Sequence, residues 1–207
     1  MRRRRGTRAS LLVAMVAVVA GVALVQGCNA VDRRPDPTSP PPGHGPYTGT
    51  VADWPLWFPR HYFGTDCFSV RACRIDYGGL PHLYETRQPT FESLGRPVEK
   101  VLRASTGPIR NFPPPAEVTW TTLDGVELSA IVDIAEIFAD RLVRHPVPRD
   151  DIMRNAHIPF PGIILVVDGR TIHVYMSTWI PLKESRKPGN PVGDLHTGLV
   201  HVHSRTY

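Results

Sequence analysis

The sequence predicts an α+β fold, built mainly from antiparallel strands in hairpins, with one packed helix. Two pairs of strand-like runs are joined by Asp-Gly turns, at Asp124-Gly125 and at Asp168-Gly169. A single amphipathic segment, about 134–144, has helical spacing. The chain also contains 22 prolines, which interrupt helices and central strands, so we expect a loop-rich fold with short elements.

The first hairpin is predicted from the residues on both sides of Asp124-Gly125. The run EVTWTTL, 117–123, is rich in β-branched and aromatic residues, and VELSAIVDI follows the turn. Such runs favour strands, and Asp-Gly between them is a strong signal for a tight turn. We therefore expect two adjacent antiparallel strands here.

A helix is predicted directly after this hairpin. Asp133 can cap its amino terminus, and Glu136 lies three residues later, as in a capping box. The apolar stripe of the helix consists of Ile134, Ile137, Phe138 and Leu142. Pro146 ends the predicted helix, because proline breaks a helix interior.

The second hairpin is predicted around Asp168-Gly169. The run GIILVV, 162–167, is apolar throughout, so we expect a central strand that is covered on both faces. RTIHVYMSTWI follows the turn as the second arm. The alternating tail, 196–207, predicts a last strand, and 70–77 predicts an earlier strand that carries Cys73.

The first 27 residues predict a bacterial lipoprotein signal peptide. A basic start, MRRRRGTR, precedes an uncharged apolar run over 11–25. As a helix this run spans about 22 Å, short of a bilayer core of roughly 30 Å, and an uncleaved signal anchor is the alternative. Val25-Gln26-Gly27-Cys28 resembles the lipobox, from which Gln26 departs. The resemblance implies cleavage after Gly27 and a lipid anchor on Cys28.

Cleavage at that point predicts three parts: a signal peptide, 1–27, a tether, 28–52, and one periplasmic globular domain, 53–207. The tether begins with the lipidated Cys28 and is rich in proline, so we expect it to be extended and flexible. The domain is long enough to bury a core of its own. Asn29, by analogy with enterobacterial lipoproteins, favours the outer membrane over the inner one.

The charge of the chain is concentrated in the signal peptide. The whole chain has 24 Lys and Arg against 19 Asp and Glu, and its net charge is +5. Removing the five arginines of 1–27 leaves 19 positive residues, which balance the 19 acidic ones. Nucleic-acid binding uses a basic stripe on the folded part. None is visible, so we expect no nucleic-acid partner.

The remaining cysteines, Cys67 and Cys73, are predicted to form a disulfide. They are close in sequence, and an exported chain meets an oxidising environment that favours pairing. Closing so short a loop contributes about 2–2.5 kcal/mol by chain entropy. Structural zinc usually takes four ligands, and no second cysteine pair is present to complete such a set.

The histidines are the candidate metal ligands. His201 and His203 alternate in LVHVHS, so they are expected to share one strand face, with His173 on a neighbouring hairpin arm. Such a pair could supply two zinc ligands. The alternative is a solvated strand face, with Val200 and Val202 directed into the core. We favour this alternative and predict no cofactor.

No catalytic motif is found in the sequence. The nucleophile elbow G-x-S-x-G, a phosphate-binding glycine loop and H-E-x-x-H are all absent from it. We therefore predict no catalytic residue and favour a binding protein over an enzyme.

Aromatic residues are concentrated in WPLWFPRHYFGTDCF. Phe58, Phe63 and Phe68 are predicted to lie in the core. Trp54 and Trp57 adjoin the tether, and they either pack in the core or anchor a protein partner.

The hairpin sequences AEVTWTTLDGVELSAIVDI and GIILVVDGRTIHVYMS resemble small periplasmic lipoproteins of proteobacteria, over about 115–180. Some of these are immunity proteins paired with toxic secreted effectors. The matching motif is Trp120, Leu123, Asp124 and Gly125. The resemblance implies a tethered inhibitor that occludes a toxic effector enzyme, and it carries over no binding residue.

Two further hypotheses remain. One is a structural or assembly lipoprotein of a cell-envelope or secretion complex. The other is a divergent metal-dependent enzyme that uses the carboxy-terminal histidines.

Overall fold

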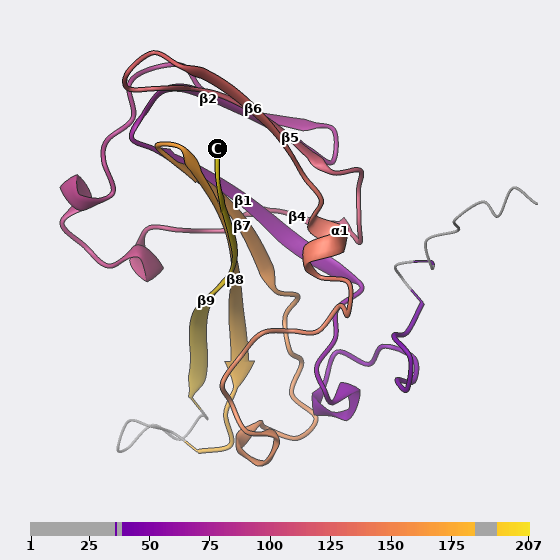
Figure 1. The fold of residues 1–207 in the computed structure, drawn as a ribbon. Helices are drawn as coiled ribbons and strands as arrows, with labels where there is room; N and C mark the ends of the chain where they lie inside the picture. Colours follow the sequence, from indigo (N-terminus) through magenta and orange to yellow (C-terminus); the bar gives the residue numbers. More distant parts are fainter. Residues whose placement is uncertain (1–35, 37–38, 185–193) are drawn as a thin grey trace, which may run out of the picture. The chain divides into compact units, whose positions relative to one another are not determined.

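The computed structural model describes residues 36, 39–184 and 194–207, so the predicted signal peptide and Cys28 lie outside the described residues. Strands predominate (Figure 1). They are β1 (Arg60–Phe68), β2 (Val70–Tyr77), β3 (Leu80–Tyr84), β4 (Thr106–Arg110), β5 (Ala116–Thr122), β6 (Glu127–Val132), β7 (Gly162–Asp168), β8 (Thr171–Pro181) and β9 (Leu195–Thr206). The helices are η1 (Val51–Asp53), η2 (Glu92–Leu94), η3 (Val98–Lys100), α1 (Ile134–Ile137) and η4 (Arg149–Asp151). In this described part, no helix has the length and apolarity needed to cross a bilayer.

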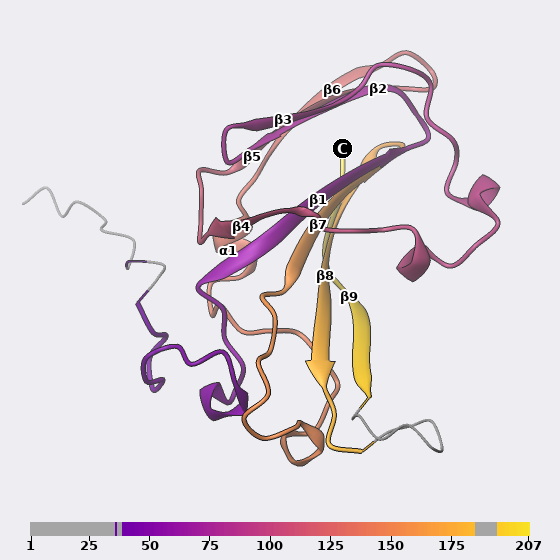
Figure 2. The same ribbon diagram turned by 180° about the vertical axis from the view of Figure 1, so that it is seen from behind.

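The strands form two sheets that pack face to face (Figures 1 and 2). The five-stranded sheet has the order β4-β1-β7-β8-β9, and the four-stranded sheet has the order β3-β2-β5-β6. β1 pairs in parallel with β7, whereas the other pairs are antiparallel. The main core lies between the sheets and includes Phe63, Ile163, Leu165, Val174 and Met176 from the larger sheet and Ile75, Tyr77, Val118, Trp120 and Val132 from the smaller one.

A disulfide joins the two sheets near one end of the core. β1 and β2 belong to different sheets and are separated by Ser69, whose φ is 53°. Cys67 of β1 is bonded to Cys73 of β2, and each is 3% exposed. The predicted pairing is therefore confirmed, and it fixes the point at which the chain passes from one sheet to the other.

Both predicted hairpins are present. β5 and β6 are joined around Asp124-Gly125, where Gly125 has a φ of 91° and its N–H donates to Thr122 O over 3.0 Å. β7 and β8 are joined at Gly169, whose φ is 58°. Glycine adopts such positive φ values without a steric penalty, which explains why Asp-Gly predicts these turns.

β7 is a central strand buried on both faces, as its apolar sequence predicts. Ile163, Leu165 and Val167 face the four-stranded sheet. Ile164 and Val166 face the other way and are covered by the segment 91–104, called the cover segment below. Its apolar side chains are Phe91, Leu94, Val98, Val101, Leu102 and Ala104.

The predicted helix over 134–144 forms only its first turn. Asp133 caps it as predicted, because its side chain accepts from the N–H groups of Ala135 and Glu136. The helix ends at Ile137, and Arg141 has a φ of 58°, outside the helical region. Beyond this point the backbone bonds to other parts of the chain, since Arg141 O accepts from Phe58 N–H over 3.1 Å. Tertiary partners thus replace the helical hydrogen bonds, and the fold is mostly β-sheet.

The folded part begins before residue 53. Residues 39–52 were predicted to belong to the flexible tether, but they contact the domain in the structure. Gly49 O accepts from Ile158 N–H over 2.7 Å. The ring of Tyr47 lies 5.2 Å from that of Trp57, edge to face. Tyr47 and Gly49 therefore pack on the domain in the described structure.

Candidate functional site

A hollow lies on the outer face of the four-stranded sheet and is lined by residues of β2, β3, β5 and β6. It encloses about 540 Å³ and is open to solvent. One row of outward side chains crosses all four strands, because the register aligns them: Leu83, Arg74, Thr119 and Ser129. Thr119 lies near the centre of the row, with exposed polar neighbours on both sides. The face is therefore a hydroxyl-lined trough rather than an enclosed pocket.

This trough is rich in carboxylates. Glu85 and Glu127 line it, and Asp76 and Glu117, which pair across β2 and β5, lie beside it on the same outer face. Arg74 crosses the middle and is ion-paired with Asp76, with 2.6 Å between Nε and Oδ2. Leu83 in its lining is 52% exposed, and Ile131, which pairs with Glu117 farther along the same outer face, is 64% exposed. Acidic groups beside exposed apolar groups suit a protein surface of opposite charge.

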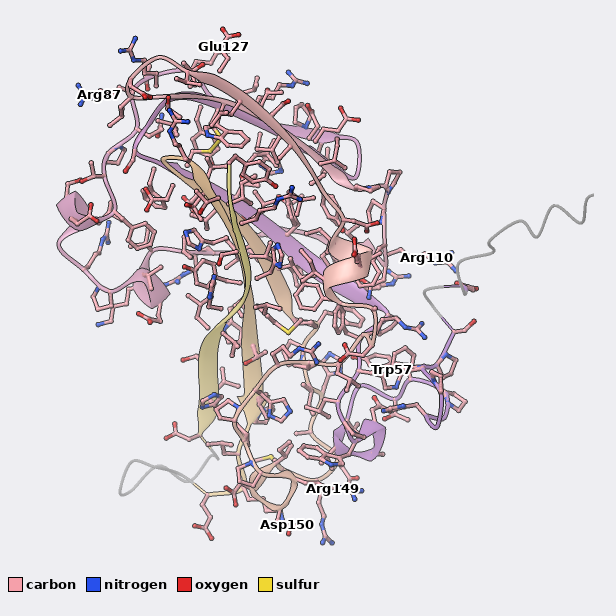
Figure 3. All side chains as sticks on the ribbon, viewed as in Figure 1. Trp57, Arg87, Arg110, Glu127, Arg149 and Asp150 are labelled. Carbon is pink, nitrogen blue, oxygen red and sulfur yellow. A yellow bond between two sulfur atoms is a disulfide. The ribbon has the colours of Figure 1, made fainter. Side chains whose placement is uncertain are left out.

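The two hairpin turns contact each other at one end of this trough. Trp120 donates from Nε1 to Gly169 O over 2.8 Å, and Arg170 forms an ion pair with Asp124 at 3.0 Å. Trp120 is 3% exposed. Trp120 and Asp124 of the smaller sheet therefore join it to the β7–β8 turn of the larger sheet. In Figure 3, Glu127 lies at this end and Arg149 at the opposite end.

The second polar cluster lies on the outer face of the five-stranded sheet. His173 of β8 and His201 of β9 approach each other, with 3.3 Å between Nδ1 of the first and Nε2 of the second. Tyr175 packs beside both rings, with centroid distances of 6.1 Å to His173 and 5.0 Å to His201. Burial, and then the neighbouring His201, lower the pKa of His173. The lowered pKa favours the neutral imidazole, in which one ring nitrogen carries a lone pair.

His203 does not join this cluster, although the alternation of His201 and His203 predicted that both lie on one strand face. A β-bulge shifts the register of β9, so that Tyr175 pairs with His201 while Val174 pairs with His203. Val174 faces the core and Tyr175 faces outward, so the two histidines point to opposite sides of the sheet. An extra residue in one strand reverses the alternation beyond it, and sequence alternation alone does not reveal it.

Trp54 and Trp57 lie at the base of the domain. Trp57 is 2% exposed and packs against Tyr47, so it is a core residue and does not offer an anchor to a partner (Figure 3). Trp54 is partly buried, and its ring lies 5.6 Å from that of His145. Phe58, Phe63 and Phe68 are buried as predicted, at 0%, 0% and 3% exposure.

A buried polar network was not foreseen from the sequence. His61 is 0% exposed, and its Nδ1 lies 2.6 Å from Asn111 Oδ1. The Tyr77 hydroxyl lies 3.1 Å from His61 Nε2. Burial lowers the pKa of His61 to about 4. These residues come from distant parts of the chain, so no local sequence pattern predicts that they meet. Because the network is buried, it contributes to the stability of the fold.

No described residues other than the histidine pair suggest a metal centre. In the part of the chain that the structure describes, no group of three or more His, Cys, Asp or Glu side chains is placed to hold a metal ion. Comparison of the chain with known protein families, characterised proteins and solved structures found no match.

Proposed function

We propose that the chain is a lipid-anchored protein of a bacterial envelope that binds a toxic secreted protein and blocks it. The supporting observation is the acid-rich trough on the outer face of the four-stranded sheet. Its exposed Leu83 and Ile131 lie among carboxylates on paired strands, which hold the surface in one shape. A rigid surface loses little conformational entropy on binding, so it suits an inhibitor.

The anchor in this proposal is the lipid on Cys28, which holds the chain in the outer membrane and facing the periplasm. Residues 39–52 lead from that anchor. They lie near the end of the domain opposite the hairpin turns (Figure 1). Thr50 and Val51 line the same hollow as Arg149 at that end. This arrangement leaves the hairpin turns and the trough accessible to a partner that reaches the periplasm.

The mechanism is occlusion. A toxic effector enzyme with a basic rim around its active site docks on the trough, so that the carboxylates face the basic rim and the exposed apolar groups are buried. Opposite charges speed the encounter and orient the partner, while the central contacts supply most of the affinity. The bound sheet then excludes substrate from the enzyme's active site.

The test uses the product of the gene adjacent to this one, produced in cells with and without the chain. Cells with the chain survive, and cells without it lose viability. Thr119→Arg places a bulky cation in the centre of the trough and weakens binding by about 2 kcal/mol or more, roughly 30-fold. Thr197→Arg is the matched control, because Thr197 is also an exposed strand threonine but lies on the other sheet.

Binding is measured by calorimetry and protection by cell survival. Loss of both in Thr119→Arg but in neither for Thr197→Arg supports the proposal. If cells that lack the chain resist the adjacent gene product fully, the proposal is wrong. Stoichiometric recovery of a cell-envelope or secretion complex, in place of a toxin, supports the assembly role instead.

A further inference from the structure

Two imidazole rings on the outer face of the five-stranded sheet have the separation of metal ligands. His173 Nδ1 and His201 Nε2 are 3.3 Å apart. In a tetrahedral zinc site the metal–nitrogen distance is about 2.0–2.1 Å, which places two ligand nitrogens about 3.3–3.4 Å apart. The two values agree, so the separation of these nitrogens, which form a hydrogen bond when no ion is bound, matches that of two ligands of one ion.

The backbone places the pair in this position through the β-bulge of β9. The register shift between Val174 and Tyr175 directs His201 to the face that carries His173 and directs His203 to the other face. Bulges often redirect side chains at functional sites. Both histidines also lie within paired strands, which hold ligands more firmly than loops do.

The chemistry of the pair suits a divalent transition-metal ion. A metal ligand must be an unprotonated imidazole, and neutral imidazole binds zinc, copper and nickel. His173 is partly buried, and His201 is exposed, so an ion can reach the pair from solvent. The carboxylate of Asp168 is close enough to influence His173 electrostatically, and its negative charge favours a cation nearby.

We propose that His173 and His201 form a two-histidine binding site for a divalent transition-metal ion such as zinc. The chain supplies two ligands, and water fills the remaining positions of the ion. The site lies on the five-stranded sheet, away from the acid-rich trough, and it does not depend on the proposed inhibitor function. Open coordination positions distinguish it from a closed structural zinc site.

The experiment is calorimetric titration of the full chain, purified in detergent, with zinc chloride. The unaltered chain takes up one zinc ion at this site. His173→Ala and His201→Ala each weaken zinc binding roughly tenfold or more, because each removes a ligand. His203→Ala is the matched control, since it removes a histidine two positions away on the same strand but on the opposite face. Zinc binding of that variant is unchanged.

A second measurement separates ligation from a change in fold. Zinc shifts the imidazole nitrogen resonances of His173 and His201 in the unaltered chain and leaves those of His203 in place. The proposal is overturned if the unaltered chain does not bind zinc, or if His203→Ala weakens binding as much as the other two substitutions. It is also overturned if all three variants bind zinc like the unaltered chain, since the rings then form a cross-strand hydrogen bond and no metal site.

Discussion

The buried His61 network predicts a specific loss of stability in mild acid. The side-chain amide of Asn111 donates to Phe58 O over 2.7 Å, so its Oδ1 accepts from the Nδ1–H of His61. His61 Nε2 then accepts from the Tyr77 hydroxyl. Both ring nitrogens are occupied in the neutral form, and a second ring proton would face the Tyr77 oxygen in a buried site.

The pKa of His61 gives both the direction and the magnitude of this loss of stability. The folded chain holds the pKa of His61 at about 4, below the value of 6.5 for the free side chain. The unfolded chain therefore binds a proton first, and the stabilisation is fully present above pH 6.5 and is lost as the pH falls to 4. At about 1.4 kcal/mol per pH unit, His61 alone removes about 3 kcal/mol by pH 4. That is a large share of a typical stability of about 5–15 kcal/mol.

The assay compares urea unfolding of the unaltered chain with that of His61→Gln between pH 7.5 and pH 4. Glutamine does not titrate, and its amide is polar like the ring it replaces. At pH 7.5 the unaltered chain is the more stable of the two, and the difference shrinks by about 3 kcal/mol by pH 4. Other groups with shifted pKa values, such as Asp66 and His173, titrate in both proteins and cancel in this difference. A difference that stays constant across this pH range would refute the reasoning.

Three further predictions concern the sheet and its cover. Gly64→Ala places a Cβ 1.9 Å from Arg103 O of the cover segment, so we expect the free energy of unfolding to fall by about 1–3 kcal/mol or more. Urea unfolding measures this loss. Gly45→Ala is the control, because a Cβ there meets nothing within 4 Å and leaves the free energy of unfolding nearly unchanged. Replacing both Cys67 and Cys73 by alanine lowers the free energy of unfolding by about 2 kcal/mol, and equal urea midpoints with and without the disulfide contradict this. Burial raises the pKa of Asp66 from 3.8 to about 6, so stability is lost as the pH rises between these two values and the full loss remains above pH 6. Asp66→Asn is therefore expected to raise the melting temperature at pH 8 and to lose most of this advantage at pH 4, and a pH-independent effect argues against it.

The sequence predicted the elements whose causes are local. Asp124-Gly125 and Asp168-Gly169 specify turns through backbone conformations that glycine adopts easily, and both hairpins are present. The apolar run of β7 predicted a strand covered on both faces, because only such a strand can bury every side chain. Asp133 caps the start of α1, a contact that spans three residues.

Elements that depend on distant partners were missed or overextended. β1 is an inner strand of the five-stranded sheet, between β4 and β7, but its sequence does not alternate, and its parallel partner β7 is far along the chain. The helix predicted over 134–144 has a regular apolar stripe, and it is nonetheless interrupted because Arg141 bonds to Phe58. Helical spacing describes local preference, and tertiary hydrogen bonds can outweigh it.

The candidate sites also combine features that the sequence predicted with features that depend on distant contacts. His201 and His203 were recognised as possible ligands from their residue type, but the bulge separates them and brings His173 to His201 instead. Trp57 was recognised as a large aromatic group, and its burial depends on residues 39–52, which pack beside it. The acid-rich trough had no signal in sequence, since its rows cross from the β2–β3 pair to the β5–β6 pair, and these two pairs are far apart in the chain.

The sequence by itself determined the two hairpins, the buried character of β7 and the disulfide between Cys67 and Cys73, whereas the lipid anchor at Cys28 stays a prediction. Each of these depends on residues that are near one another in the chain. Tertiary structure alone decided which faces are covered, which histidines meet and where the carboxylates gather. The physical reason is that pairing register and packing are set by contacts between strands, and one extra residue in β9 reverses the side to which a histidine points.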